Sequence, residues 1–443
     1  MKKALVLCGG GSKGAYQMGV WQALNELNLK FDIVTGTSIG ALNGVMYVQN
    51  KYDDCIDLWH NARNDTIMTT PISLEEPSIK ASLKKMNDLI PFVRTYIEKK
   101  GADITPFKKM MEHYIEPEKV VNSDITFGVM TVSFPQFKPI PKVLNGANVD
   151  EVIPYVLASA SCFPLFPVCK IGDLSLVDGG YYDNLPINFA LELGATEIVA
   201  VDLNYAITHK EYLNKPFIKY IYPSWNLGSF FLFEEKAIND NKILGYNDAM
   251  KAYGKYDGFR YTFYREELDE NLLKNFMIKV ANVERIFNQK NLKSLDKTDE
   301  GSSIYKILEK YTNSSLNYKE YYLRALEVCA EFFKIDHLKL YTAALLKQLI
   351  CDKLVSISLE DDELLIDYFK TKTISKKREL LLRANKYDLL CLLSIKEDLF
   401  NSENEGLLID VLLTKPKLIV FLLLIDLWRE FDEKTKENED TIN

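Results

Sequence analysis

The residue with the clearest chemical potential is Ser38, which lies in a Gly-Thr-Ser-Ile-Gly pentapeptide bounded by Gly36 and Gly40. A serine at a tight strand-to-helix turn needs small neighbours on both sides if its hydroxyl is to be exposed as a nucleophile. The apolar run 31–34 before the turn and the helical run 41–48 after it predict that setting. We therefore interpret Ser38 as a candidate nucleophile. A serine that only caps the following helix is the simpler interpretation.

A second candidate is the glycine-rich loop at residues 9–14, Gly-Gly-Gly-Ser-Lys-Gly, which precedes a helical stretch over 15–27. Successive small residues let backbone N–H groups converge on an anion at a helix N-terminus. Such fixed donors suit an oxyanion hole, which stabilises the charge that develops on a carbonyl oxygen in a transition state.

The same loop also fits the G-x-G-x-x-G fingerprint of dinucleotide-binding proteins, which is the main alternative. That fingerprint requires an acidic residue at the end of the second strand, where this chain has Thr35 and Gly36 instead. A phosphate-binding P-loop is excluded because no Lys-Ser or Lys-Thr pair follows Gly14. Lys13 either steadies the loop or extends into solvent, and the sequence does not choose between these.

The third candidate is Asp178, which follows the apolar run 174–177 and precedes Gly179 and Gly180. A strand over this run would deliver the carboxylate at its end, and the paired glycines would allow a close backbone approach. An ordinary Asp-Gly turn is the simpler interpretation. His209 offers another arrangement, because serine, aspartate and histidine would then follow the chain order of the triad in α/β-hydrolases.

Taken together and in this order, the three motifs resemble the patatin-like phospholipase family. The resemblance covers residues 1–264 and includes the proline-rich block 158–167 and the segment 245–249. It implies a three-layer α/β/α domain with a mainly parallel central sheet. It also implies a dyad of Ser38 and Asp178 that hydrolyses lipid acyl esters through an acyl-enzyme, with neither a metal nor an organic cofactor. The candidate oxyanion donors that the resemblance implies are the N–H groups of Gly9, Gly10 and Gly11. The remaining motif positions are support for these groups: Lys13, Gly14, Gly36, Gly40, Gly179, Gly180.

The chain of 443 residues exceeds the roughly 250 to 300 residues that one hydrophobic core usually serves, so we expect more than one domain. Strands alternate with helices as far as about residue 264, which predicts a catalytic domain over 1–264. Residues 265–431 show only amphipathic helical patterns and predict an all-helical domain of unknown role. The charged segment 432–443 predicts a disordered tail.

The bulk composition excludes several classes of function. A net charge of -8 and a sequence pI near 5.4 argue against nucleic acid as a partner. Seven scattered cysteines without a C-x-x-C pair indicate neither a disulfide framework nor a zinc site, and they favour a cytoplasmic protein. The longest apolar run, 418–425, is too short to span a membrane. A second-domain helix is the expected role of that run, and a non-catalytic adaptor built from the helical region is a further alternative.

The expected partner is a lipid or another acyl ester, with a transient contact at a membrane surface, and no protein partner is indicated. Interfacial enzymes carry apolar side chains at the rim of the site, although the same side chains serve equally well as core. The candidates for the rim are Phe134, Phe137, Leu165, Phe166, Tyr222 and Trp225.

Overall fold

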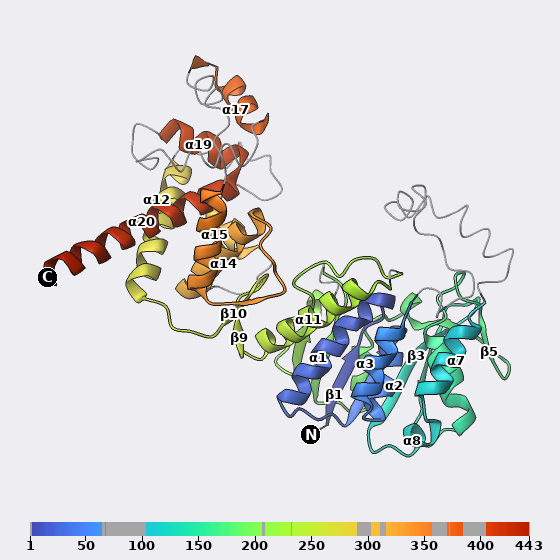
Figure 1. Ribbon diagram of the computed structural model, residues 1–443. Helices are drawn as coiled ribbons and strands as arrows, with labels where there is room; N and C mark the ends of the chain where they lie inside the picture. Colours follow the sequence, from blue (N-terminus) through green and yellow to red (C-terminus); the bar gives the residue numbers. More distant parts are fainter. Residues whose placement is uncertain are drawn as a thin grey trace. The chain divides into compact units, whose positions relative to one another are not determined.

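The structure is a computed structural model, and it divides into two compact units, Met1–Lys255 and Tyr256–Asn443 (Figure 1). The sequence pattern alone places the boundary at residue 264. The residues that the structure describes are 2–63, 67, 103–205, 209–231, 233–289, 303–310, 316–356, 370–371, 373–383 and 405–442.

The first unit is built on a mixed sheet. Its strands are β1 (Lys3–Leu7), β2 (Ile33–Thr37), β3 (Thr126–Ser133), β4 (Pro139–Val143), β5 (Cys169–Ile171), β6 (Leu174–Asp178), β7 (Glu197–Val201) and β8 (Ile218–Ile221). Within the described residues seven of these strands follow the order β5-β6-β3-β2-β1-β7-β8, and the eighth, β4, pairs with β3. The pairs from β3 through β2, β1 and β7 to β8 are parallel, whereas β4 and β6 run antiparallel to β3. The prediction of a mainly parallel sheet is therefore confirmed.

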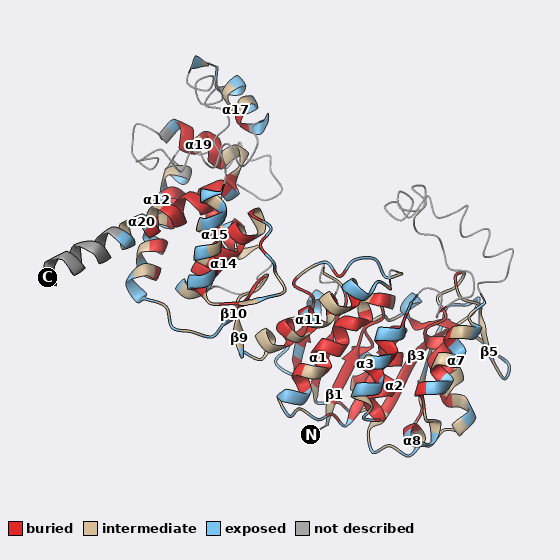
Figure 2. Ribbon diagram, in the orientation of Figure 1, coloured by how far each residue is buried: buried red, intermediate tan, exposed pale blue. Residues whose placement is uncertain are grey.

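Helices cover both faces of this sheet, as Figures 1 and 2 show for the face that carries α1, α2 and α3. The helices of the unit are α1 (Ala15–Glu26), α2 (Ile39–Val48), α3 (Tyr52–Asn61), α7 (Thr105–Tyr114), α8 (Pro117–Val121), α9 (Val152–Ser159), α10 (Ile187–Glu192) and α11 (Glu235–Ala252). Consecutive residues of a strand point to opposite faces. Phe127 of β3 lies against Gly44 of α2, whereas the next residue, Gly128, lies against Phe189 of α10. The predicted three-layer arrangement is thus confirmed.

The helices α1 and α11 touch backbone to backbone. A Cβ atom on Gly19 would lie 1.8 Å from the carbonyl oxygen of Lys242, and one on Gly245 would lie 1.9 Å from the carbonyl oxygen of Tyr16. Near this crossing the Tyr16 hydroxyl donates a hydrogen bond of 3.0 Å to Asp248. Because α1 begins directly after the glycine-rich loop, α11 fixes the position of that loop as well.

The second unit is mainly helical. Its elements are β9 (Tyr256–Asp257), β10 (Thr262–Tyr264), α12 (Glu270–Gln289), α13 (Ile304–Glu309), α14 (Tyr318–Phe332), β11 (Leu340–Tyr341), α15 (Ala343–Val355), α17 (Ile374–Arg383), α19 (Glu405–Thr414) and α20 (Pro416–Ile442). The strands form a small sheet in the order β11-β10-β9, which the sequence did not predict. Strands of two or three residues are too short to carry an alternating pattern.

The core of the second unit joins α12, α14 and α20. The rings of Phe276 and Tyr322 lie 5.7 Å apart, and Lys279 pairs with Asp426 at 2.5 Å. The apolar run 418–425 is buried within α20. The helix continues through residues 432–442, for which the composition alone predicts a disordered tail. In the described part of the chain, no helix is both long enough and apolar enough to cross a membrane.

Candidate active site

Ser38 occupies a sharp turn between β2 and α2. Its φ of 54° lies in the region that side-chain-bearing residues rarely adopt, and its N–H donates to Ser159 Oγ at 3.0 Å. A Cβ atom on Gly36 would lie 2.3 Å from the carbonyl oxygen of Gly40. One on Gly40 would lie 2.2 Å from the carbonyl oxygen of Leu7. Packing therefore requires glycine at both positions, which explains the spacing of the motif.

Ser159, the last residue of α9, holds the serine turn through hydrogen bonds. It was not predicted as a site residue from the sequence. Its hydroxyl donates to the carbonyl oxygen of Met130 on β3 at 2.7 Å while it accepts from the N–H of Ser38. A buried hydroxyl with both roles filled holds the two groups that it joins in a fixed relation. The small-residue block before Asp178 thus includes a residue that fixes the serine turn.

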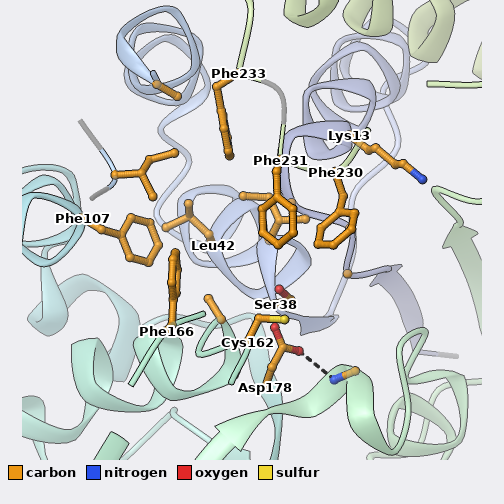
Figure 3. A pocket seen from close by; sticks show the side chains of 18 of the residues that line it. Lys13, Ser38, Leu42, Phe107, Cys162, Phe166, Asp178, Phe230, Phe231 and Phe233 are labelled. Carbon is orange, nitrogen blue, oxygen red and sulfur yellow. Dashed lines mark hydrogen bonds between the residues drawn. The ribbon is translucent and has the colours of Figure 1, made fainter. Parts of the chain in front are cut away.

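Asp178 ends β6 and is buried, with 6% of its surface exposed. Its carboxylate accepts a hydrogen bond of 2.8 Å from the N–H of Gly180. Burial raises the pKa of Asp178 to about 6, and hydrogen bonding with Gly180 and with the Ser38 side chain opposes that rise. Figure 3 shows the Ser38 hydroxyl and the Asp178 carboxylate next to one another. Two residues 140 positions apart in the chain therefore meet at one point.

The glycine-rich loop lies beside this pair, and its three candidate donors differ. The N–H of Gly9 donates to the carbonyl oxygen of Asn184 at 3.0 Å. Within the part of the chain that the structure describes, the N–H groups of Gly10 and Gly11 donate to no acceptor. Gly11 has a φ of +57°, and a Cβ atom there would lie 2.1 Å from the carbonyl oxygen of Phe230. Gly10 and Gly11 are therefore available to an anion, whereas Gly9 is already engaged.

Asn184 joins the loop to the aspartate turn, and it was also missed from the sequence. Its Nδ2 donates to the carbonyl oxygen of Gly9 at 3.0 Å, and its own carbonyl oxygen accepts from the N–H of Gly9. Its Oδ1 lies so near Gly180 that a Cβ atom there would be 2.9 Å away. An amide side chain soon after a D-G-G turn, with both a donor and an acceptor, is the signal that could have identified it.

Ser38, Asp178 and the glycine-rich loop line one cavity of about 390 Å³. Its wall is mostly apolar, and Figure 3 shows Phe107 and Phe166 on one side and Phe230 and Phe231 on the other. The rings of Phe107 and Phe166 lie 5.9 Å apart. The further apolar wall residues include Leu42, Leu58, Trp59, Ile67, Met110 and Phe233. The cavity thus combines a small polar floor with space for a hydrocarbon group.

Lys13 also lines the cavity, but its ammonium group points away from Ser38 in Figure 3. Burial lowers the pKa of Lys13, and the nearby Cys8 and Asp202 oppose that change. Lys13 therefore belongs to the structure around the loop rather than to the pair formed by Ser38 and Asp178.

The other predicted residues lie in different places. Of the rim candidates, Phe166 lines the cavity, whereas Phe134, Phe137, Leu165, Tyr222 and Trp225 do not. His209 is also outside the cavity lining, and its Nδ1 lies 3.3 Å from Glu211. Among the described residues, no group of three or more His, Cys, Asp or Glu side chains converges as a metal site would require.

Comparisons with known proteins agree with the motifs. The chain is 29% identical over 209 residues to patatin-like phospholipase domain-containing protein 7 of Mus musculus. The aligned segment covers 45% of this chain and 13% of that protein. It is 30% identical over 205 residues to lysophospholipase nte1 of Aspergillus terreus, which again covers 45% of this chain but only 12% of the relative. The matches thus span about an eighth of these relatives' lengths.

Among solved structures, VipD from Legionella pneumophila is similar at 15% identity, with 96% of this chain and 90% of that chain covered, and the TM-score is 0.35. A likeness at that level carries no conclusion. Residues 5–191 match the family model described as patatin-like phospholipase. Those residues include the glycine-rich loop, the serine turn and the aspartate turn. Over residues 5–191, the first unit is therefore similar to the patatin-like phospholipase family.

Proposed function

We propose that the chain hydrolyses carboxylic esters of lipids, with Ser38 as the nucleophile and Asp178 as its base. The observation that carries the proposal is the meeting of these two side chains at the floor of a mostly apolar cavity, beside backbone N–H groups that have no acceptor in the described part of the chain. The family and the lysophospholipase name of one relative support a phospholipase or lysophospholipase type of esterase.

The reaction would begin when Ser38 Oγ attacks the ester carbonyl and passes its proton to the carboxylate of Asp178. The N–H groups of Gly10 and Gly11 would then hold the oxyanion, because they are the donors of the loop that have no acceptor among the residues the structure describes. Collapse of this intermediate leaves the acyl group on Ser38, and the leaving alcohol takes the proton from Asp178. Water, deprotonated by Asp178, would then release the fatty acid.

The environment of Asp178 suits a base that acts without histidine. A carboxylate with an ordinary pKa near 3.9 is a weak acceptor for a hydroxyl proton. Burial raises the pKa of Asp178 to about 6, so the group is a stronger base and is still ionised at neutral pH. The N–H of Gly180 donates a hydrogen bond of 2.8 Å to the carboxylate and so keeps it oriented. Burial raises the proton affinity of the same carboxylate.

The wall of the cavity supports an apolar acyl group as the part of the substrate that enters. Aromatic and aliphatic side chains form most of the lining around the space next to Ser38. A dinucleotide would need polar partners for its ribose and phosphates, which this wall does not offer. The apolar wall therefore favours a lipid ester over the nucleotide alternative.

The experiment compares wild type with Ser38→Ala and His209→Ala. A fluorophosphonate probe should label wild type and His209→Ala on Ser38, and hydrolysis of a defined lipid panel should fall at least about a thousandfold in Ser38→Ala alone. An equally deep loss in His209→Ala would replace the dyad with the triad. Absence of labelling together with thermal stabilisation by a dinucleotide would reject the hydrolase in favour of the nucleotide-binding alternative, and absence of both would favour an adaptor.

A further inference from the structure

Four aromatic side chains, here called the aromatic edge, pack on one another beside the cavity: Phe134, Phe137, Phe163 and Tyr181. Ring centroids lie 5.0 Å apart for Phe134 and Phe163, and 5.9 Å apart for Phe134 and Phe137. Phe137 and Tyr181 lie 5.5 Å apart, and the Tyr181 hydroxyl donates to the carbonyl oxygen of Phe163. Phe137 is 44% exposed and Tyr181 is 46% exposed, so the cluster presents aromatic surface to solvent.

The aromatic edge lies on the side of the sheet where the active site opens. Parallel pairing places Thr37 opposite Met130, so β2 and β3 end at the same border of the sheet. Ser38 follows the end of β2, and Phe134 follows the end of β3. Tyr181 connects the two features, because it packs on Phe137 and also lines the cavity with Ser38. The exposed aromatic surface is therefore continuous with the mouth of the pocket.

Exposed apolar side chains of the first unit are concentrated near this border. In the described part of that unit, the large exposed apolar residues are Phe137, Leu174, Tyr181, Tyr182, Phe217, Phe230 and Ile243. Tyr181 and Phe230 line the cavity itself. Leu174 is close to the edge, because the N–H of Phe134 bonds the carbonyl oxygen of the next residue, Ser175. Grouped exposed apolar side chains mark an interaction surface more strongly than scattered ones.

We propose that the aromatic edge docks on the surface of a lipid bilayer and so places the pocket mouth over its substrate. This proposal rests on the proposed function, because an apolar cavity with a lipid substrate must receive an acyl chain from an aggregate. Aromatic side chains with a polar tip, such as Tyr181, favour the boundary between headgroups and hydrocarbon. Lys138 follows Phe137 and is exposed, which adds a positive charge on the side that faces lipid phosphates.

The balance of forces makes the proposal specific. The chain has a net charge of -8, so general electrostatic attraction to anionic lipid is weak. Burial of the aromatic edge must therefore supply most of the attachment, as for other proteins that insert apolar side chains into an interface. The attachment should persist at high salt, because salt screens exposed charges but does not weaken apolar burial.

The test measures co-sedimentation of the full chain with vesicles of phosphatidylcholine, in a Ser38→Ala background that preserves the lipid. Phe137→Asn removes the exposed ring, and asparagine tolerates the φ of 53° at that position. We expect about a tenfold loss of vesicle partition. Phe217→Asn is the matched control, because Phe217 is 39% exposed but precedes β8 and so lies at the opposite border of the sheet.

A second readout uses chains that retain Ser38. Phe137→Asn should hydrolyse a soluble short-chain ester at the wild-type rate and hydrolyse vesicle lipid about tenfold more slowly. Equal partition of Phe137→Asn and its parent, or partition that disappears at high salt, would overturn the docking proposal. If Phe137→Asn changes the mass of the protein in solution but not its vesicle partition, the docking proposal is also overturned. That result would show that the aromatic edge is a contact between copies of the chain. If no chain that retains Ser38 hydrolyses the soluble ester, the proposed hydrolase function is rejected. The docking proposal is still tested in that case, because vesicle partition is measured separately in the Ser38→Ala background.

Discussion

The floor and the wall of the cavity are built in opposite ways. The floor consists of polar groups from three tight turns: Gly10, Gly11, Ser38, Asp178. The wall consists of large apolar side chains: Phe107, Phe166, Phe231, Phe233. The floor is held by backbone contacts in which added atoms would clash, whereas the wall is formed by rings that surround a space. Substitution of the floor should therefore abolish the reaction, and substitution of the wall should only change which acyl groups fit.

The largest effect is expected for Asp178→Asn, which keeps the shape of the floor but removes its base. Hydrolysis should fall at least about a thousandfold, because asparagine does not accept the proton of Ser38. In wild type, the rate should decrease as the pH falls through about 6, where Asp178 becomes protonated. Initial rates across this pH range on a soluble ester measure both effects. A wild-type rate that stays constant down to about pH 4 would remove Asp178 as the base.

The same variant should be more stable than wild type. The folded-state pKa of Asp178 is raised to about 6, so ionisation of this group opposes folding as the pH rises from about 4 to 6. A shift of about two pKa units sets an upper limit of about 3 kcal/mol. Asp178→Asn should raise the Tm by a few degrees above pH 6, and the gain should vanish towards pH 4. The exposed Asp173→Asn is the control and should show no such change.

An intermediate effect is expected for Gly11→Ala, which perturbs one donor of the floor. The added Cβ atom would lie 2.1 Å from the carbonyl oxygen of Phe230, so the loop must shift and the N–H moves from its place. Loss of one oxyanion donor reduces the rate of acylation about a hundredfold. Gly172→Ala is the matched control, because its φ of +56° carries the same backbone strain but nothing lies within 4 Å of the added atom. Similar rate losses in both variants would mean that strain, and not the donor, is responsible.

The smallest effect is expected for Phe166→Ala in the wall. The change enlarges the space beside Phe107 and should reduce turnover of a short-chain ester only a few fold. The preference among a series of acyl-chain lengths should move towards bulkier or longer chains, as kcat/KM for each ester would show. Phe217→Ala, outside the cavity, should leave the series unchanged. A loss in Phe166→Ala as deep as that in Asp178→Asn would erase the distinction between wall and floor.

The difference between the floor and the wall also explains which parts of the structure could be predicted from the sequence. The elements around the floor were predicted to within a few residues, for example α1, α2 and β6, because apolar runs and glycines define their limits. The turns also have fixed spacing, as Gly36 and Gly40 show. By contrast, β4, β5 and β8 were not predicted, since β5 and β8 have only three and four residues and β4 contains two prolines. The sequence could not reveal Phe231 or Phe233 as wall residues, because only the fold brings them to Ser38.

The central residues of the site were predicted from the sequence, but the roles of several residues around them were not. Ser38 and Asp178 were named from motifs and meet in the structure, although their catalytic roles stay predictions. The roles of Gly9 and Asn184 depend on one pair of reciprocal hydrogen bonds, and the only signal of it in the sequence is an amide residue soon after the D-G-G turn. Ser159 was hidden for the same reason, since any serine in a small-residue block looks alike until its partners are known.

The contact between the glycine-rich loop and the segment before α11 also sets when this site can exist during synthesis. The Ser12 hydroxyl bonds the carbonyl oxygen of Ser229, 217 residues later, and Gly19 packs directly on the backbone of α11. The segment that matches the family model ends at residue 191, before any of these partners has been made. A ribosome that has completed the three motifs has therefore still not produced the part that holds the loop in place, and we expect the nascent chain to acquire its working geometry only after α11 emerges.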